Sequence, residues 1–334
     1  MEGTIIITGP TGGLGRAILH RIKQLNHPFT TILAVRSLES AKTQALRDSL
    51  GKDPRFRIWH LDLESLDCVR TFATSLRIYV STGRLKPITA LICNAGMMSR
   101  FRPKFTHDGY ERVFQINYLA NFLLVNALLP AMDSRNCRVV FMTSFTHDPT
   151  CLRAKLLPLP RRLWLDSKML AHPPVPRRNS TKAGFARYAR SKMCLMMFMH
   201  SLQERLDRSV EYKNIAILAV DPGFIGATEI MREQNLLCTF AVEKVVTLLT
   251  PISERLFSNS LLRSPERSAN DIVRVGLDLK TGGGSDTAKA MVCNGHKLEQ
   301  SGRESRDRQK QKELWDVSLS LVGLTLEEEA FIDE

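Results

Sequence analysis

The chain has 334 residues, of which 43% are hydrophobic and 24% are charged, with 19 glycines and 15 prolines. This length suits one large domain or two smaller ones, and the composition excludes a disulfide-stapled miniprotein, a collagen-like chain and a low-complexity segment. The formal net charge of +13 favours an anionic partner, such as nucleic acid, an acidic membrane surface or a phosphorylated ligand.

The seven cysteines are scattered and form no CxxC pair, so the sequence predicts neither a disulfide framework nor a metal site. We therefore expect a reducing, cytoplasmic location. No charged leader precedes the first apolar run at residues 4–8, and no secretory signal is predicted. The longest apolar stretch, residues 114–132, is interrupted by Asn117, Asn121 and Asn126, so no transmembrane segment is predicted.

Seven short runs of aliphatic and β-branched residues predict buried strands at residues 4–8, 31–36, 56–62, 90–94, 138–144, 214–221 and 290–293. Between the early runs, apolar residues recur at helical spacing, as in Leu14, Ile18 and Ile22. Strand and helix alternate, and the strands are apolar on both faces. The pattern predicts a doubly wound α/β fold, with helices on both faces of a parallel sheet of about seven strands.

Three regions depart from this alternation. Residues 145–182 form a basic insertion, in which positions 151–182 carry eight Lys and Arg residues against the single acid Asp166. The insertion could bind nucleic acid or a membrane surface, but positions 151–182 carry no large aromatic besides Trp164, so we expect a solvated loop and no nucleic-acid partner. Residues 222–262 contain an apolar segment that forms either a lid over a site or an ordinary packed helix pair. In the extension 299–334, alternating charges predict a solvated approach to a closing helix.

A glycine cluster follows the first predicted strand, within the segment TGPTGGLG at residues 8–15. Gly9, Gly13 and Gly15 would let the chain turn sharply into a helix and bring its backbone close to a pyrophosphate at the helix N-terminus. The alternative is a tight turn without a ligand. Because the cluster lies between a predicted strand and a predicted helix, we favour the phosphate loop.

The second predicted strand ends in Arg36, 21 residues after Gly15. An NAD-binding domain usually carries an acid there for the ribose 2′-hydroxyl, whereas an arginine suits a 2′-phosphate. Arg16 could add a second cation, so NADPH is favoured over NADH. The alternative for both is a solvated surface arginine.

Tyr188 and Lys192 are four residues apart in a segment of helical character, and hence on one face. A neighbouring ammonium would lower the pKa of the phenol and let it exchange a proton near neutral pH. Ser144 ends the fifth predicted strand, where it could bind a substrate oxygen or cap the strand. Asn117 lies within a helical run, where it could order a water that returns protons to the lysine, or serve as a packing amide.

Taken together, these motifs resemble the short-chain dehydrogenase/reductase family. The resemblance rests on TGPTGGLG at 8–15, LDL at 61–63, CNAG at 93–96, Asn117, Ser144, YARSK at 188–192 and DPG at 221–223, in the family's order. It covers the chain from Thr4 to about Leu324. Three further stretches are similar to the retinol dehydrogenase and WW-domain oxidoreductase branch: residues 108–124, SPERSA at 264–269 and residues 312–324.

The resemblance implies a single Rossmann-type NADP(H)-binding domain over residues 1–334. It implies that Tyr188 is the acid/base, that Lys192 lowers its pKa and holds the nicotinamide ribose, that Ser144 orients the carbonyl and that Asn117 supports proton relay. Asp62 would contact adenine, Asn94 the region near the ribose, and Pro222 and Gly223 the nicotinamide. The full set expected to bind the cofactor is Gly9, Thr11, Gly13, Leu14, Gly15, Arg16, Arg36, Asp62, Leu63, Asn94, Tyr188, Lys192, Pro222 and Gly223.

The function expected on this basis is NADPH-dependent reduction of a carbonyl, or oxidation of the alcohol, of a lipophilic small molecule, with a role in secondary metabolism. The alternative is a non-catalytic NADP-binding regulatory protein. A homodimer through the helices bearing Asn117 and Tyr188 is compatible with the resemblance. Two departures from the family pattern are the 44-residue interval from Ser144 to Tyr188, lengthened by the basic insertion, and Thr228, one place beyond the expected threonine position.

Overall fold

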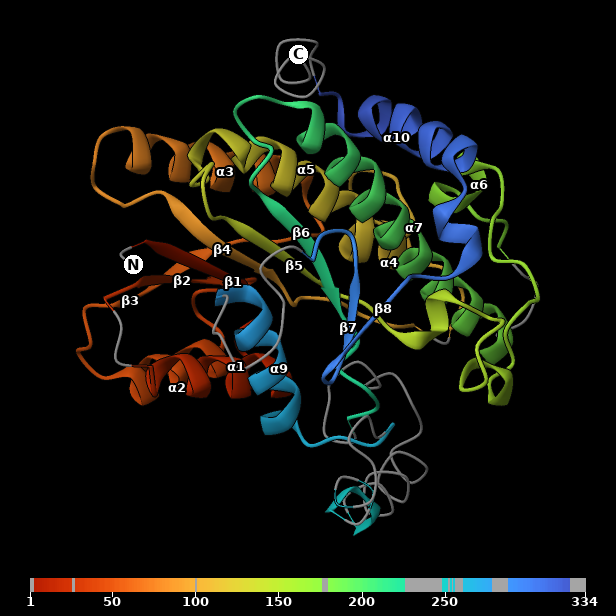
Figure 1. Cartoon of the computed structure of the whole chain (residues 1–334), viewed down its shortest axis with the longest axis horizontal. Helices are drawn as coiled ribbons and strands as arrows, with labels where there is room; N and C mark the ends of the chain where they lie inside the picture. The colour runs from red at the N-terminus through yellow and green to blue at the C-terminus, as the bar shows by residue number, and fades with distance from the viewer. Residues whose placement is uncertain are drawn as a thin grey trace.

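The computed structural model describes residues 3–25, 28–99, 101–175, 180–225, 248–251, 253, 255, 261–277 and 288–324. These residues form an eight-stranded sheet in the order β3-β2-β1-β4-β5-β6-β7-β8, covered by helices on both faces (Figure 1). The strands are β1 (Thr4–Thr8), β2 (Thr30–Val35), β3 (Phe56–His60), β4 (Ile88–Cys93), β5 (Arg138–Met142), β6 (Ala216–Val220), β7 (Val292–Asn294) and β8 (Lys297–Glu299).

The doubly wound fold predicted from the sequence is confirmed. Neighbouring strands from β3 to β7 are parallel, and every residue of β1, β5 and β6 is buried. This burial on both faces explains why these strands are continuous apolar runs. Strand β8, which pairs antiparallel with β7, was not predicted because its three residues are all exposed.

Helices cover the sheet in two layers (Figure 1). One face carries α1, α2 and α9, and the other carries α3, α5 and α7, with α10 outside α7. The helices are α1 (Gly13–Lys23), α2 (Ala41–Leu50), α3 (Leu66–Ser81), α4 (Arg112–Phe114), α5 (Ala120–Leu128), α6 (Ser167–Ala171), α7 (Thr181–Arg208), α9 (Pro265–Leu277) and α10 (Arg308–Val322). A π-helical turn, η1 (Gln115–Leu119), joins α4 to α5.

The strand order reverses direction between β1 and β4, because β2 and β3 lie on one side of β1 and the later strands lie on the other. In open α/β sheets, ligands bind outside the carboxyl ends of the strands at such a switch point. The fold therefore places the site beside the loops that follow β1 and β4.

One helical stretch, Arg112–Ala131, is long and apolar enough to be compared with a membrane span. It is 89% buried over its most apolar window. Phe114, Tyr118 and Phe122 pack there in a chain of ring contacts 5.2 and 6.2 Å apart between centroids. Within the described residues, this stretch is a core helix of the domain.

The C-terminal extension packs against the domain through α10, and the segment that leads into α10 is only partly solvated. In α10, the Trp315 ring lies 5.0 Å from that of Phe122 and 5.8 Å from that of Phe198 on α7. Ser301 and Ser305, in the approach to α10, are buried. The predicted solvated approach is correct for charged residues such as Arg303 and Arg306, which are exposed, and wrong for Ser301 and Ser305, which face inward.

The described part of the basic insertion is also partly packed. Leu163, Leu170 and Ala171 are buried in the core. The carboxylate of Glu304 accepts hydrogen bonds from the backbone N–H groups of Leu163 and Trp164, both at 2.9 Å. The expectation of a solvated loop is therefore wrong for these buried residues, whereas Arg161, Arg162 and Lys168 of the insertion are exposed as expected. Most of the predicted lid at 222–262, including Thr228, lies outside the described residues.

Candidate active site

The glycine loop after β1 is built from close backbone contacts. Gly9 has φ +65°, in the left-handed region, and a Cβ there would lie 3.1 Å from Ala95 after β4. A Cβ on Gly15 would lie 2.2 Å from the carbonyl oxygen of Gly9. Helix α1 begins at Gly13, and its N-cap, Gly12, offers no side-chain hydrogen bond. The N–H groups at Gly13 and Leu14 thus have no capping side chain and suit an anion.

Asn94, at the end of β4, fixes this loop from the side. Its Nδ2 donates to the carbonyl oxygens of Thr8 and Gly9, both at 3.0 Å. The Thr8 hydroxyl accepts from the N–H of Ala95 at 2.9 Å. Asn94 therefore shapes the loop directly, and its predicted position near a ribose stays a prediction.

The two candidate phosphate cations are exposed. Arg36 directly follows β2, its side chain is 67% exposed, and its NH1 lies 3.4 Å from Oε1 of Glu64. Arg16 is exposed in the first turns of α1. Asp62 lies in the turn after β3, where its Oδ1 accepts from the N–H of Glu64 at 3.0 Å, and the neighbouring Leu63 is buried. All these residues lie at the carboxyl edge of β1, β2 and β3.

Lys192 is buried at the centre of the site. Its Nζ donates to the carbonyl oxygen of Met142, the last residue of β5, at 2.7 Å. A Cβ on Gly96 would lie 3.5 Å from this Nζ and 3.3 Å from Oδ1 of Asn117. Gly96 therefore allows the loop after β4 to pass close to both Lys192 and Asn117.

Asn117 lies in the π-helical turn and uses its amide to join three elements. Its Nδ2 donates to the Met97 carbonyl and the Ser191 hydroxyl, both at 2.9 Å, and its Oδ1 accepts from the Met97 N–H at 2.8 Å. Ser191 in turn donates to the carbonyl of Tyr188 at 2.7 Å. The side chain is thus a packing amide that holds α7 against the loop after β4, and the relay role stays a prediction.

Ser144 follows β5, and its side chain lies near enough to the phenol of Tyr188 to favour the ionised form of that phenol. The same hydroxyl accepts from the N–H of Thr146 at 3.4 Å and so caps the 3-10 turn η3 (Phe145–His147). Ser144 is therefore both a strand-end cap and a partner of Tyr188. The structure brings Ser144, Tyr188, Lys192 and Asn117 to one place.

The predicted lowering of the Tyr188 pKa is wrong for this arrangement. Burial raises the pKa of Tyr188, and the hydrogen bond with Ser144 acts in the opposite direction but is the smaller effect. Lys192 is engaged by Met142, its Nζ is 5.7 Å from the centroid of the Tyr188 ring, and burial lowers its own pKa to about 8. The four-residue spacing predicted that Tyr188 and Lys192 lie on one helix face. It gave no sign that both side chains are buried away from water.

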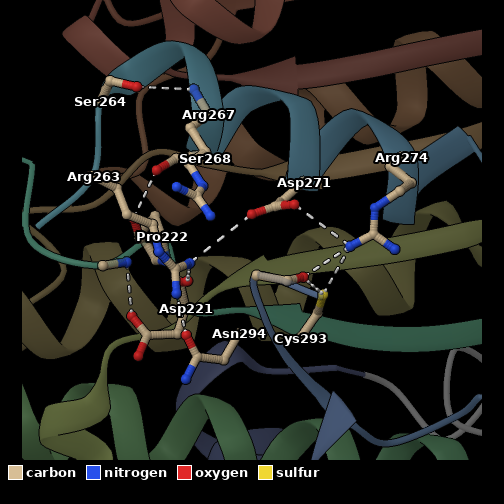
Figure 2. A network of polar contacts seen from close by, with 12 residues as sticks. Asp221, Pro222, Arg263, Ser264, Arg267, Ser268, Asp271, Arg274, Cys293 and Asn294 are labelled. Carbon is tan, nitrogen blue, oxygen red and sulfur yellow. Dashed lines mark hydrogen bonds and ion pairs between the residues drawn. The ribbon is translucent and has the colours of Figure 1, made fainter. Parts of the chain in front are cut away.

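The turn at Pro222 and Gly223, after β6, is surrounded by charged residues (Figure 2). Gly223 has φ +74°, and its N–H donates to Oδ1 of Asp221 at 3.0 Å. Buried Arg263 donates to the carbonyl of Asp221 at 3.1 Å, and Ser268 on α9 donates to the carbonyl of Pro222 at 2.7 Å. These contacts fix the turn beside the site.

From the basic insertion, Arg153 reaches the same turn. Its NH1 lies 3.4 Å from Oδ2 of Asp221, and its guanidinium lies 5.6 Å from the centroid of the Phe145 ring. The insertion thus reaches the residue before the Pro222-Gly223 turn.

Several residues that build the site were missed in the sequence. Tyr188 belongs to an apolar cluster with Met98 and Val113, against which Met97 and Phe185 pack. Met97 and Met98 directly follow the CNAG motif, so their place in the sequence could have predicted that they lie at the site. No sequence pattern could have predicted the roles of Arg153 and Arg263, because their contacts to Asp221 span 68 and 42 residues.

Comparison with known proteins agrees with this geometry. A profile for short chain dehydrogenases matches residues 3–149. The short-chain dehydrogenase iccH of Talaromyces variabilis is 31% identical over 97% of this chain and 96% of its own length. The polyprenol dehydrogenase of Danio rerio is 30% identical over 96% of this chain and 86% of its own length. The NADPH-bound carbonyl reductase from chicken fatty liver shares the fold, with a TM-score of 0.59, 16% identity, and coverage of 89% and 98% of the two chains.

The chain therefore belongs to the short-chain dehydrogenase family, whose members are oxidoreductases that use nicotinamide cofactors.

Proposed function

We propose that this protein is an NADPH-dependent oxidoreductase that reduces a carbonyl, or oxidises the corresponding alcohol, of a lipophilic small molecule. The observation that carries the proposal is the meeting of Tyr188 and Lys192 at the end of β5, where the Nζ of buried Lys192 lies 5.7 Å from the centroid of the Tyr188 ring and donates to the carbonyl of Met142, two residues before Ser144. The Ser144 hydroxyl and the Tyr188 phenol, if they lie side by side, can both donate hydrogen bonds to one carbonyl oxygen.

In this proposal, Tyr188 donates a proton to the oxygen of the carbonyl as negative charge develops there. Its raised pKa keeps the phenol protonated at neutral pH, which suits a proton donor. Ser144 orients the same oxygen, and Lys192 supplies a positive charge near the phenol. The dinucleotide supplies the hydride when it is bound.

The positions of the α1 N-terminus and of Arg36 support the preference for NADPH. The uncapped N-terminus of α1 suits a pyrophosphate, and Arg36 directly follows the neighbouring strand β2, where a 2′-phosphate would be recognised. The Arg36–Glu64 contact is exposed, so it contributes little stability and leaves the guanidinium available for another anion.

A change at Arg36 tests this preference. We expect Arg36→Asp to lower kcat/KM with NADPH by about 10- to 100-fold, as expected for loss of a charge-assisted contact, and to leave kcat/KM with NADH nearly unchanged or improved. Arg135→Asp is the matched control, because Arg135 is 82% exposed and precedes β5, at the opposite end of the strands. Equal losses with both cofactors would contradict the assignment of Arg36 to the 2′-phosphate.

A lipophilic substrate is supported by the apolar residues around Tyr188. Met98 and Val113 are buried against the Tyr188 ring, and Phe185 packs beside them one turn earlier on α7. The name of the polyprenol dehydrogenase relative likewise denotes an apolar alcohol. A homodimer and a role in secondary metabolism stay predictions.

Removal of the phenolic hydroxyl tests the proposed activity. We expect Tyr188→Phe to lower kcat by about 10²- to 10⁴-fold on a panel of apolar ketones with NADPH, because general acid catalysis is lost. Tyr79→Phe is the control, since Tyr79 lies on α3 and packs against Trp59, with ring centroids 5.0 Å apart. Equal rates for Tyr188→Phe and wild type would favour the alternative of a non-catalytic NADP-binding regulator.

A further inference from the structure

A buried histidine lies three residues after Ser144, at the end of η3. His147 is 7% exposed, and no motif in the sequence points to it. It lies at the junction of the loop after β5 and the C-terminal segment 299–306.

Two contacts of the imidazole define its protonation. Nδ1 lies 2.6 Å from the carbonyl oxygen of Ser144, which also accepts the backbone N–H of His147 at 3.0 Å. Nε2 accepts the backbone N–H of Gly302 at 3.2 Å. A carbonyl can only accept and an amide N–H can only donate, so the ring is neutral, with its proton on Nδ1 and a lone pair on Nε2.

Gly302 is itself held firmly from several sides. A Cβ at this position would lie 2.8 Å from the Cβ of Asp148, so the close approach requires glycine. Its carbonyl accepts the N–H of Ser305 at 3.1 Å. The adjacent Ser301 hydroxyl lies 2.7 Å from Nε2 of His200 on the catalytic helix α7. The segment is therefore a rigid support for the imidazole.

We infer that His147 is a positioning residue for Ser144: its neutral Nδ1–H tautomer ties the Ser144 carbonyl to the amide of Gly302, so that the C-terminal segment fixes the hydroxyl beside Tyr188. This inference rests on the proposed function in that Ser144 orients the reacting carbonyl. It gives the C-terminal segment, 155 residues further along the chain than His147, a part in the geometry of the active site.

Protonation of the ring would break this arrangement. An imidazolium would place an Nε2–H against the N–H of Gly302, so that two donors face each other. The charged and titratable groups facing the ring are Asp148 and Arg153 from the insertion, Asp221 after β6, and His200 on α7. Burial lowers the pKa of His147 below its ordinary value and keeps the working tautomer present at neutral pH.

The kinetic test separates the two ring nitrogens. An asparagine amide can occupy the place of Nδ1, and a glutamine amide the place of Nε2. We expect His147→Asn, which loses the bond to Gly302, and His147→Gln, which loses the bond to Ser144, each to lower kcat, and His147→Ala to lower it most, by about 10- to 100-fold, with the KM for NADPH within about threefold of wild type. The matched control is His200→Asn, which removes a contact to the same segment without touching Ser144. A kcat for His147→Ala equal to that of the control would overturn the inference.

The pH profile adds a readout that a merely structural role would not move. In wild type, kcat should fall on the acid side as His147 becomes protonated, and His147→Asn should lack this fall. An identical acid limb in both proteins would count against the inference.

A second measurement does not depend on turnover. Nitrogen-15 chemical shifts of the histidine rings should show His147 protonated on Nδ1 only, and the Gly302 amide should exchange with solvent faster in His147→Asn than in wild type. If wild type turns over no carbonyl but these two results hold, the proposed function fails and the tether stands. A proton on Nε2, or unchanged exchange at Gly302, would reject the tether whatever the activity.

Discussion

Two turns at the carboxyl edge of the sheet border the site, and they are held in different ways. The turn after β1 contains Gly9 at φ +65°, and the turn after β6 contains Gly223 at φ +74°. In the first, neutral groups make short contacts with the backbone, as where Asn94 donates to the carbonyls of Thr8 and Gly9. In the second, most of the supports are the charged side chains of Arg153 and Arg263, with a further hydrogen bond from Ser268.

The ionic support of the second turn extends well beyond it (Figure 2). Arg263 hydrogen-bonds Asp221 and Asn294, and its NH1 lies 4.0 Å from the carboxylate of Asp271 on α9. Asp271 in turn pairs with Arg274 at 3.5 Å. Both turns are held from distant parts of the chain, since Asn94 lies 85 residues from Gly9 and Arg263 lies 42 residues from Asp221, so the turns differ in the charge of their supports and not in the span of their contacts.

The largest effect is expected at Arg263, which is fully buried. Arg263→Ala should lower the free energy of unfolding by about 3–5 kcal/mol, because the carboxylate of Asp271 and the carbonyl of Asp221 would be left buried without this partner. Urea denaturation followed by circular dichroism measures the change.

Arg274→Ala is the matched control for the same network. Its side chain is 22% exposed, so water can replace part of its contact with Asp271, and we expect a loss of about 1 kcal/mol or less. If the two variants lost equal stability, burial would not be what distinguishes the second turn.

Lys192, which is buried beside Gly96 and Met142, provides a test with pH. Burial lowers its pKa to about 8 in the folded protein, against 10.5 in the unfolded chain. Between these values the unfolded chain binds the extra proton, so the stability of wild type relative to Lys192→Met should rise with pH, by up to about 3 kcal/mol from pH 8 to pH 10.5. Below pH 8 both states are protonated, and the difference should be flat.

Denaturation of both proteins at a series of pH values measures this slope, since all other titrating groups are common to the pair. Lys312→Met serves as a control at an exposed site, where the side chain is 75% exposed. A difference between wild type and Lys192→Met that did not change above pH 8 would show that the ammonium is solvated.

Local patterns in the sequence explain which features of the fold and site could be predicted. Seven strands were predicted within two residues at most of their ends, because buried parallel strands leave long apolar runs. The glycine loop was predicted because a strand, a turn and a helix follow one another within 20 residues. Tyr188 and Lys192 were found because helical spacing places them on one face.

The remainder depended on contacts between distant segments. Glu304 caps the insertion at Leu163, 141 residues earlier, and Gly302 meets His147 across 155 residues. No local pattern in the sequence indicates such a contact, so the buried residues within 299–313 were not predicted. The pKa of Tyr188 was predicted with the wrong sign for the same reason, because desolvation depends on the surrounding fold.

The smallest effect is expected in the first turn, at Asn94. Asn94→Ala removes two hydrogen bonds, but the side chain is only partly buried and water can reach part of the space. We expect a loss of about 1–2 kcal/mol in the free energy of unfolding, well below that of Arg263→Ala, with Asn270→Ala on the exposed side of α9 as the neutral control. Because Asn94 holds the carbonyls of Thr8 and Gly9, the same variant should also weaken NADPH binding in titration calorimetry. A loss as large as that of Arg263→Ala would mean that neutral and ionic supports contribute equally, and the distinction between the two turns would not hold.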